Sequence, residues 1–123
     1  MLICKKAEKD GFSVAFSNDK FKCAFIKYSV SYSFGSVLEM KRHNKTDEIF
    51  MLLKGRAVML TLEDGEFYET ELKENTAISV IKGTWHYLAL SCDAEVFVVE
   101  NADTNASNTD ILKLDKEYML VYN

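Results

Sequence analysis

The 123-residue sequence contains no proline, only three cysteines and only two histidines. The cysteines, Cys4, Cys23 and Cys92, are odd in number, widely spaced and never arranged as C-x-x-C. This pattern argues against a disulfide framework and a thiolate zinc site, and it predicts buried free thiols. A chain of this length is expected to form one domain with one hydrophobic core.

Long apolar runs and basic clusters are also missing. Only four apolar residues open the chain before mixed charge begins, and no later run could span a bilayer, so we expect neither a signal peptide nor a membrane segment. Lysine and arginine never form a run longer than a pair, and the formal net charge is −4. Such a chain offers no basic surface to a phosphate backbone, which argues against nucleic acid as a partner. We therefore expect a cytoplasmic protein.

The apolar residues that are present form short segments typical of β-strands. These segments are rich in Val, Ile, Phe and Tyr and are bounded by polar turn residues. Residues 12–16 and 21–25 alternate around a polar turn and predict an opening hairpin. Further strands are predicted at residues 36–40, 48–53, 56–62, 67–72, 77–81, 85–90 and 95–99, with 111–114 as a candidate tenth strand. The regular spacing predicts an all-β sandwich or barrel.

The C-terminal part changes character twice. Residues 101–110 are polar or small and predict a loop, whereas residues 118–122 are too apolar to remain in water. This tail must pack either on its own barrel or on a second subunit, and the sequence leaves both open.

Each of the two histidines lies beside a predicted strand. Strand alternation places Glu48 on one face with Phe50 and Leu52, and it places His86 on one face with Leu88 and Leu90. A carboxylate and an imidazole therefore stand at the ends of faces that are otherwise apolar. The same alternation turns Asp47, Trp85 and Tyr87 to the opposite faces.

Burying a carboxylate or an imidazole among apolar side chains is costly unless the group is paired, hydrogen-bonded or bound to a metal. If His43, Glu48 and His86 converge, they form a set of two histidines and one carboxylate that suits zinc or a first-row divalent metal such as iron. Such a set leaves coordination positions open for water or substrate. The alternative is that each group is separately exposed or hydrogen-bonded at the rim of the barrel.

The spacing around both histidines matches two motifs of a known family. His43, four residues, Glu48, six residues and Gly55 fit the second half of G-x5-H-x-H-x3–4-E-x6-G, and residues 83–86 supply the G-x2-H core of G-x5-P-x-G-x2-H-x3-N. From about residue 36 to residue 100 the sequence therefore resembles the cupins, in particular the small single-domain bacterial members of the conserved-barrel group. The resemblance implies a double-stranded β-helix, or jelly-roll barrel, with 36–100 as its motif-bearing core, 11–28 as an N-terminal hairpin and 101–123 as a loop and tail. It also implies a homodimer.

The departures from the family pattern concern the metal. Lys41 occupies the position of the first metal-binding histidine, Ile81 replaces the proline and Leu90 replaces the asparagine. Carried over residue by residue, the family's ligands map to His43, Glu48 and His86, with Zn, Fe, Ni or Mn as candidate ions. Lys41 lies on the face of His43, so its charge would weaken metal binding unless its flexible stem turns to solvent or an anion lies between them.

The resemblance admits several functions. The expected ligand is a small polar or anionic metabolite, gripped by Lys41 within walls formed by Phe50, Leu52, Met59 and Leu88. With a metal, an isomerase, epimerase or dioxygenase is implied. A metal-free module that holds a sugar or carboxylate without turnover is the alternative, and a barrel that serves only dimerisation is a third reading, for which the apolar tail is the only support.

Overall fold

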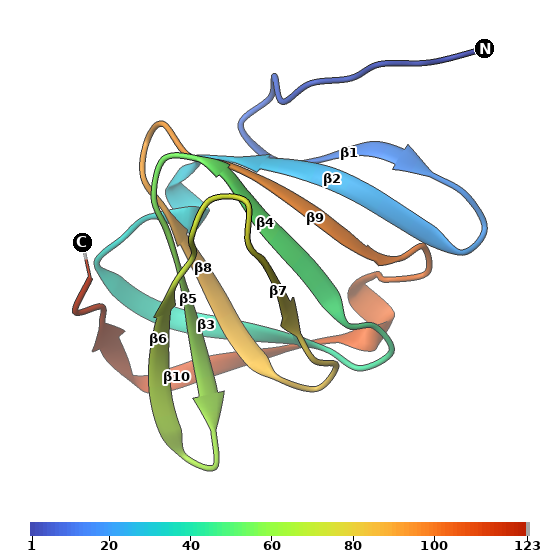
Figure 1. Ribbon diagram of the computed structural model, residues 1–123. Coiled ribbons are helices and arrows are strands. Elements are labelled where there is room, and N and C mark those ends of the chain that lie inside the picture. Colours follow the sequence, from blue (N-terminus) through green and yellow to red (C-terminus); the bar gives the residue numbers. More distant parts are fainter. Residues whose placement is uncertain (123) are drawn as a thin grey trace.

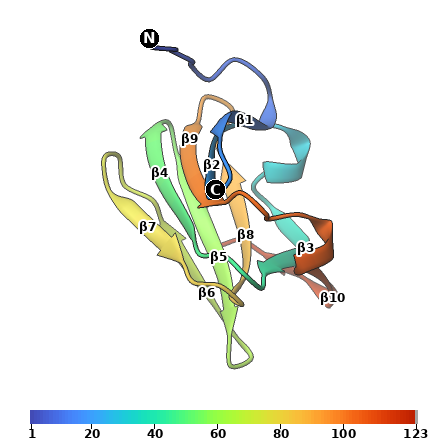
Figure 2. The same ribbon diagram turned by 90° about the vertical axis from the view of Figure 1, so that its right-hand side faces the viewer.

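The computed structural model describes residues 1–122, which form two five-stranded antiparallel sheets facing each other (Figures 1 and 2). One sheet, called sheet A, has the order β1 (Gly11–Ser17), β2 (Phe21–Lys27), β9 (Glu95–Asn101), β4 (Glu48–Lys54) and β7 (Ala77–Val80). The other, sheet B, has the order β10 (Thr109–Met119), β3 (Ser36–His43), β8 (Trp85–Leu90), β5 (Ala57–Glu63) and β6 (Glu66–Glu71). Two short 3-10 helices, η1 (Val30–Tyr32) and η2 (Ala106–Asn108), complete the described elements. The predicted all-β fold class is confirmed.

Local sequence sets the clearest hairpin. Asp64 and Gly65 take positive φ angles of 50° and 79°, the conformation that a two-residue hairpin turn requires and that Asp-Gly tolerates. The turn pairs Glu63 with Glu66 and so fixes the register of β5 against β6 along the whole hairpin.

The core between the sheets is formed by inward-facing residues of β2, β9, β4, β5 and β8. Its fully buried members include Leu52, Met59, Leu90, Val96 and Val98. On each strand they alternate with residues that face outward, as in any two-layered β-structure. This core surrounds the inner end of the candidate site.

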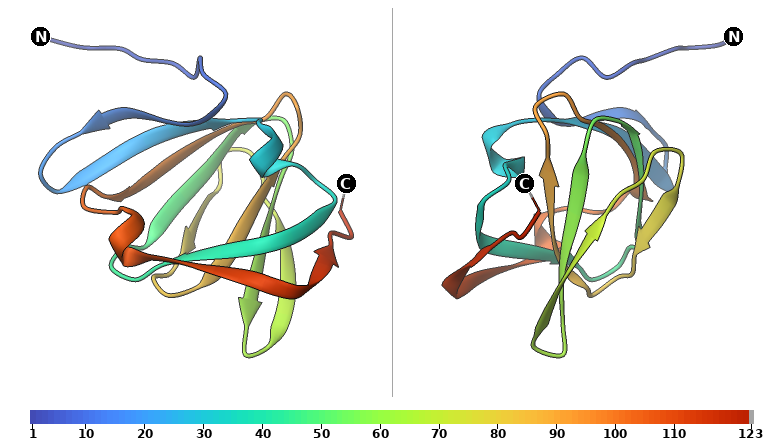
Figure 3. Two further views of the ribbon diagram at one scale, coloured as in Figure 1. Left: turned by 180° about the vertical axis from the view of Figure 1, so that it is seen from behind. Right: turned by 60° about the vertical axis from the view of Figure 1, so that its left-hand side comes forward.

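The expectation of a single core is wrong. Leu60 and Ala89 belong to the opposite face of sheet B, where they form a second cluster with Val37, Met40 and Leu120. This outer cluster arises because the ribbon of β3 and β10 crosses the outside of β8 and β5 (Figure 3). Apolar side chains on both faces of β5 and β8 are therefore covered within one chain.

The C-terminal region contains more regular structure than predicted. The candidate tenth strand is an 11-residue strand, β10, which pairs with β3 from Thr109 opposite His43 to Met119 opposite Ser36. Beyond it, Leu120 is only 4% exposed in the outer cluster, so this part of the tail packs on its own barrel. Val121 is 79% exposed.

The N-terminal segment, residues 1–10, leads away from β1 without joining a sheet (Figures 1 and 3). None of the described helices is long or apolar enough to cross a membrane.

The three cysteines differ in burial. All three thiols are free, but the prediction of buried thiols holds only for Cys23, whereas Cys4 and Cys92 are exposed.

Candidate metal site

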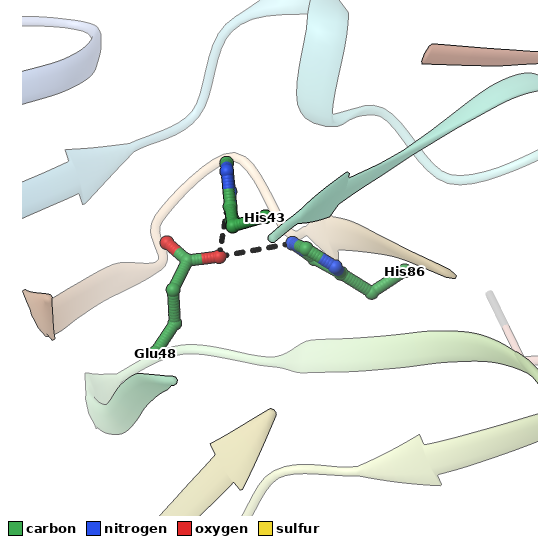
Figure 4. A group of neighbouring side chains, drawn as sticks. All are labelled: His43, Glu48 and His86. Carbon is green, nitrogen blue, oxygen red and sulfur yellow. Dashed lines mark ion pairs between the residues drawn. The ribbon is translucent and has the colours of Figure 1, made fainter. Parts of the chain in front are cut away.

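The three candidate ligands come from both sheets. His43 is the last residue of β3, and Glu48, after a four-residue connection, is the first residue of β4 in the facing sheet. His86 is the second residue of β8, which lies beside β3. The three side chains point toward one another in the space between the sheets (Figure 4).

Backbone contacts hold the two histidine-bearing segments together. The Gly83 N–H donates to the carbonyl oxygen of His43 at 2.7 Å, and the Lys82 N–H donates to Oδ1 of Asp47 at 2.8 Å. Gly83 has a φ of 83°, a conformation that favours glycine. These two hydrogen bonds attach the loop after β3 to the turn before β8. Gly83, the glycine of the G-x2-H motif, therefore helps to hold His86 close to His43.

The ligating atoms lie close enough to share one ion. Oε1 of Glu48 is 2.9 Å from Nε2 of His43 and 3.0 Å from Nε2 of His86 (Figure 4). The three ligand atoms lie within 4.8 Å of one another, so a small convergence of the side chains brings all three to one ion at ligand distances of about 2.0 to 2.2 Å. The side chains are 15%, 6% and 9% exposed for His43, Glu48 and His86, so water is largely excluded.

Each imidazole is oriented through its other nitrogen. Nδ1 of His86 lies 2.9 Å from the carbonyl oxygen of Thr84, and because a carbonyl only accepts, this nitrogen carries the proton. In the neutral ring, Nε2 of His86 therefore carries no proton and presents a lone pair. Nδ1 of His43 lies 2.8 Å from the Thr109 hydroxyl, which can donate or accept, so this contact orients the ring without fixing which nitrogen carries the proton. Such partners fix the ring orientation of metal-binding histidines.

Glu48 carries an unsatisfied atom. Its Oε1 is buried and, within residues 1–122, has no hydrogen-bond partner, although both Nε2 atoms lie nearby. A carboxylate oxygen facing the lone pair of a neutral imidazole is a contact between two acceptors, which is costly in a buried place. A cation among the three atoms removes that cost, so the donor set fits a divalent metal.

A second buried carboxylate, Glu100, adjoins Glu48. Glu100 follows Val99 on β9, which pairs with Ile49 on β4, and it is 7% exposed. Burial, and then the contact with the Glu48 carboxylate, raise the pKa of Glu100 to about 7, while Lys22 at 3.4 Å opposes this. Burial also acts to raise the pKa of Glu48, but hydrogen bonds from His43 and His86, which donate from Nε2 when the rings are protonated, and from Glu100 outweigh it and hold that pKa far below its usual range.

A phenol stands near both carboxylates. Burial, followed by the negative charges of Glu48 and Glu100, raises the pKa of Tyr32 in η1 to about 12. Tyr32, which packs against the inner core, therefore stays protonated at neutral pH.

The predicted ligand-binding residues take two different places. Phe50, Leu52, Met59 and Leu88 are buried between the sheets, and the Phe50 ring lies edge-on to His86 with 6.5 Å between centroids. Lys41 pairs with His86 across β3 and β8 but is exposed to solvent. Contact of any of these residues with a ligand stays a prediction.

The residues expected to face away from the site do so. Asp47 is exposed and caps the Lys82 N–H. Trp85 packs in the outer cluster beneath the Arg42 guanidinium at 4.4 Å, and the Tyr87 hydroxyl donates to the Ser33 carbonyl oxygen at 2.6 Å.

Sequence reasoning missed Glu100, Tyr32 and Thr109. Glu100 continues the inward alternation of Val96 and Val98, a signal that could have identified it had the predicted strand not ended at residue 99. Tyr32 and Thr109 reach the site only through tertiary structure and carry no local signal.

Comparison with known proteins gives the fold. No family model matches the sequence, and no curated protein matches it. Among solved structures, it is similar to the 3,4-ketoisomerase QdtA from Thermoanaerobacterium thermosaccharolyticum in complex with TDP-4-keto-6-deoxyglucose, with a TM-score of 0.60 and 12% identity over 72% of this chain and 63% of that one. This chain thus spans less than two thirds of the ketoisomerase.

Two further structures are nearer to this chain in length. A cupin-2 domain protein from Shewanella frigidimarina has a TM-score of 0.56 and 20% identity, over 74% of this chain and 79% of that one. KdgF from a Halomonas species has a TM-score of 0.55 and 17% identity, over 73% and 76%. These likenesses confirm a jelly-roll barrel of the cupin type.

Proposed function

Given a cupin fold whose two sheets enclose His43, Glu48 and His86, we propose that this protein binds a divalent metal at these residues and presents it to a small polar molecule. The observation that carries the proposal is the buried Oε1 of Glu48, which has two imidazole nitrogens within 3.0 Å and, in the described chain, no hydrogen-bond partner. A single proton can bridge only one of these two contacts, whereas one metal ion can take all three atoms.

The chain's own residues favour this role. Thr84 and Thr109 hold the Nδ1 atoms, so that both Nε2 atoms remain directed at Glu48. The surrounding apolar side chains exclude water, which strengthens electrostatic interactions inside the site. Two nitrogens and one oxygen suit Zn, Fe, Ni or Mn, and three protein ligands leave positions for water or substrate.

A bound metal would supply Lewis-acid or redox chemistry. Some isomerases and epimerases, and many dioxygenases, use such a centre, and a sugar ketoisomerase is among the similar structures. The residues that would hold or move a proton are Glu100 and Tyr32, because a pKa raised to about 7 lets Glu100 both bind and release a proton near neutral pH, and a pKa raised to about 12 keeps Tyr32 protonated.

The test is the metal content of protein purified without an affinity tag. We expect about one ion per chain after loading, loss of that ion in Glu48→Gln and in His86→Ala, and full retention in Asp47→Asn. Asp47→Asn is the matched control because Asp47 is the adjacent acid but is exposed and faces away from the site. If the wild-type chain takes up no metal, the metal-free binding module replaces the proposal.

We also propose that the protein is a homodimer. The outer face of sheet A is apolar. Phe21, Ile49 and Leu53 on this face are 48%, 46% and 40% exposed. The rings of Phe25 and Phe97 lie on the same face, with 5.5 Å between their centroids. Antiparallel sheets commonly keep one face polar, and a contiguous apolar face marks an interaction surface. A second copy of the chain would cover this apolar face.

A cytoplasmic location is proposed as well. Cys4 and Cys92 are exposed and unpaired in the chain. Exposed thiols persist in reducing compartments.

A further inference from the structure

A cavity of about 250 Å³ opens between the two sheets beside the candidate metal site. Thr61 of β5 and Val80 of β7 line it, and they pair directly with His86 and Glu48 on the neighbouring strands. Thr84, whose carbonyl oxygen accepts from His86, lines it too. Two residues that line the cavity are therefore direct cross-strand neighbours of two of the three candidate ligands.

The polar lining consists of hydroxyl groups and a single carboxylate. The hydroxyls belong to Thr61, Thr70 and Thr84, and the carboxylate belongs to Glu63, whereas Ser79, opposite the outward-facing Ile49, contributes its backbone. The remaining lining residues are apolar, and no lysine, arginine or histidine is among them. An anionic ligand would find a negative charge here and no cation to offset it.

Most of these polar groups are available to a ligand. Within residues 1–122 the hydroxyls of Thr70 and Thr84 have no hydrogen-bond partner, and Thr61 has only a long contact of 3.4 Å to Glu63. Residues 78–81 line the cavity consecutively, and β7 is the last strand of sheet A. The backbone groups along its free edge thus add further neutral donors and acceptors.

The cavity is small. Sites for drug-sized ligands enclose about 300 to 1,000 Å³, so a space of 250 Å³ takes little more than a single sugar ring. A nucleotide attached to such a ring would extend outside it.

We propose that this cavity binds a neutral, polyhydroxylated molecule the size of a monosaccharide and discriminates against its anionic counterparts. Hydroxyls and the free strand edge exchange hydrogen bonds with the sugar hydroxyls, and the Glu63 carboxylate accepts charge-assisted hydrogen bonds from them. Its role as the substrate pocket rests on the proposed metal-dependent function, but binding itself does not require the metal.

Two probe sugars that differ at one carbon test the proposal. The full chain, labelled with ¹⁵N and stripped of metal with a chelator, is titrated with D-glucose and with D-glucuronate while amide signals are followed by NMR. We expect D-glucose to shift the amides of Thr61, Thr70 and Thr84, with D-glucuronate at least about tenfold weaker. Thr70→Val should weaken D-glucose binding, and Glu63→Gln should narrow the difference between the sugars.

Glu66→Gln is the matched control, because Glu66 lies in the same hairpin, opposite Glu63, but does not line the cavity. It should leave the discrimination unchanged. Equal or tighter binding of D-glucuronate, shifts that map elsewhere, or no response to D-glucose overturns the inference. Metal content is measured on the same preparation, so that sugar binding without metal uptake overturns only the proposed function, and metal uptake without D-glucose binding overturns only this inference.

Discussion

At the scale of single residues, Lys41 is where this chain departs most from the cupin motif. Its position lies opposite His86 and two residues before His43, on the same side of β3. Lys41→His would remove a positive charge and add a fourth nitrogen at the family's spacing. We expect divalent metal to bind about ten- to a hundredfold tighter, as measured by competition with a chelator.

Lys20→His is the matched control for this prediction. It makes the same chemical change in the turn between β1 and β2, in the opening hairpin rather than at the site, and should leave metal affinity unaltered. Equal or weaker metal binding in Lys41→His would show that Lys41 does not occupy the lost ligand position.

How far the site could be predicted from sequence depended on the range of the contacts. Glu48 and His86 could be assigned to inner faces because strand alternation is a local signal. Glu100 could not be placed beside Glu48, because that requires the pairing of β9 with β4, which lie far apart in the chain. The same holds for Thr109 and His43.

At the scale of elements, the connection between β4 and β5 depends on Gly55. Gly55 has a φ of 79°, and a Cβ there would lie 2.6 Å from the Ala94 Cα. Gly55→Ala should therefore lower the free energy of unfolding by about 2 to 5 kcal/mol through backbone strain and overpacking. Urea unfolding measures this change.

Gly65→Ala separates the two causes. Gly65 has the same φ of 79° but no atom within 4 Å of an added Cβ, so only the backbone strain of about 1 to 2 kcal/mol applies. Equal losses in both variants would mean that the close approach of Ala94 contributes nothing.

The C-terminal tail is attached to β6 by one carboxylate. Glu69 accepts hydrogen bonds from the Tyr118 hydroxyl at 2.7 Å and from the backbone N–H groups of Val121 and Tyr122 at 2.8 and 3.1 Å. Burial acts to raise the pKa of Glu69, but these bonds outweigh it and lower the pKa below its ordinary value of 4.5. A carboxylate with a lowered folded-state pKa stabilises the folded form above its unfolded pKa and loses that effect as pH falls.

We therefore expect the tail to detach on acidification, as pH falls below 4.5 and through the lowered pKa of Glu69, while the barrel remains folded. The amide signals of Val121 and Tyr122 should follow this release, and Glu69→Gln should abolish its pH dependence. The hydrogen bond to Glu69 also raises the pKa of Tyr118 to about 12, so the attachment should persist through neutral and mildly alkaline pH. Amide signals that stay constant down to the unfolding of the barrel would contradict this.

At the scale of the whole molecule, the apolar outer face of sheet A predicts self-association. Ile49→Lys would place two like charges in an interface related by twofold symmetry, and we expect light scattering to report a monomer in place of a dimer. Ile49 is 46% exposed, so circular dichroism should show an unchanged fold.

Ile111→Lys serves as the control, because Ile111 is 57% exposed on β10, in the other sheet. It should remain dimeric. A monomeric wild-type chain at high concentration would contradict the dimer outright.

The pairing of β10 with β3 sets an order of events during protein synthesis. All three candidate ligands have been translated by residue 86, but the hydroxyl that orients the His43 ring arrives only with Thr109. A nascent chain that has emerged from the ribosome only to residue 100 therefore carries every ligating atom without its final support. The site should mature last, after the end of the chain has closed over the strand that bears His43.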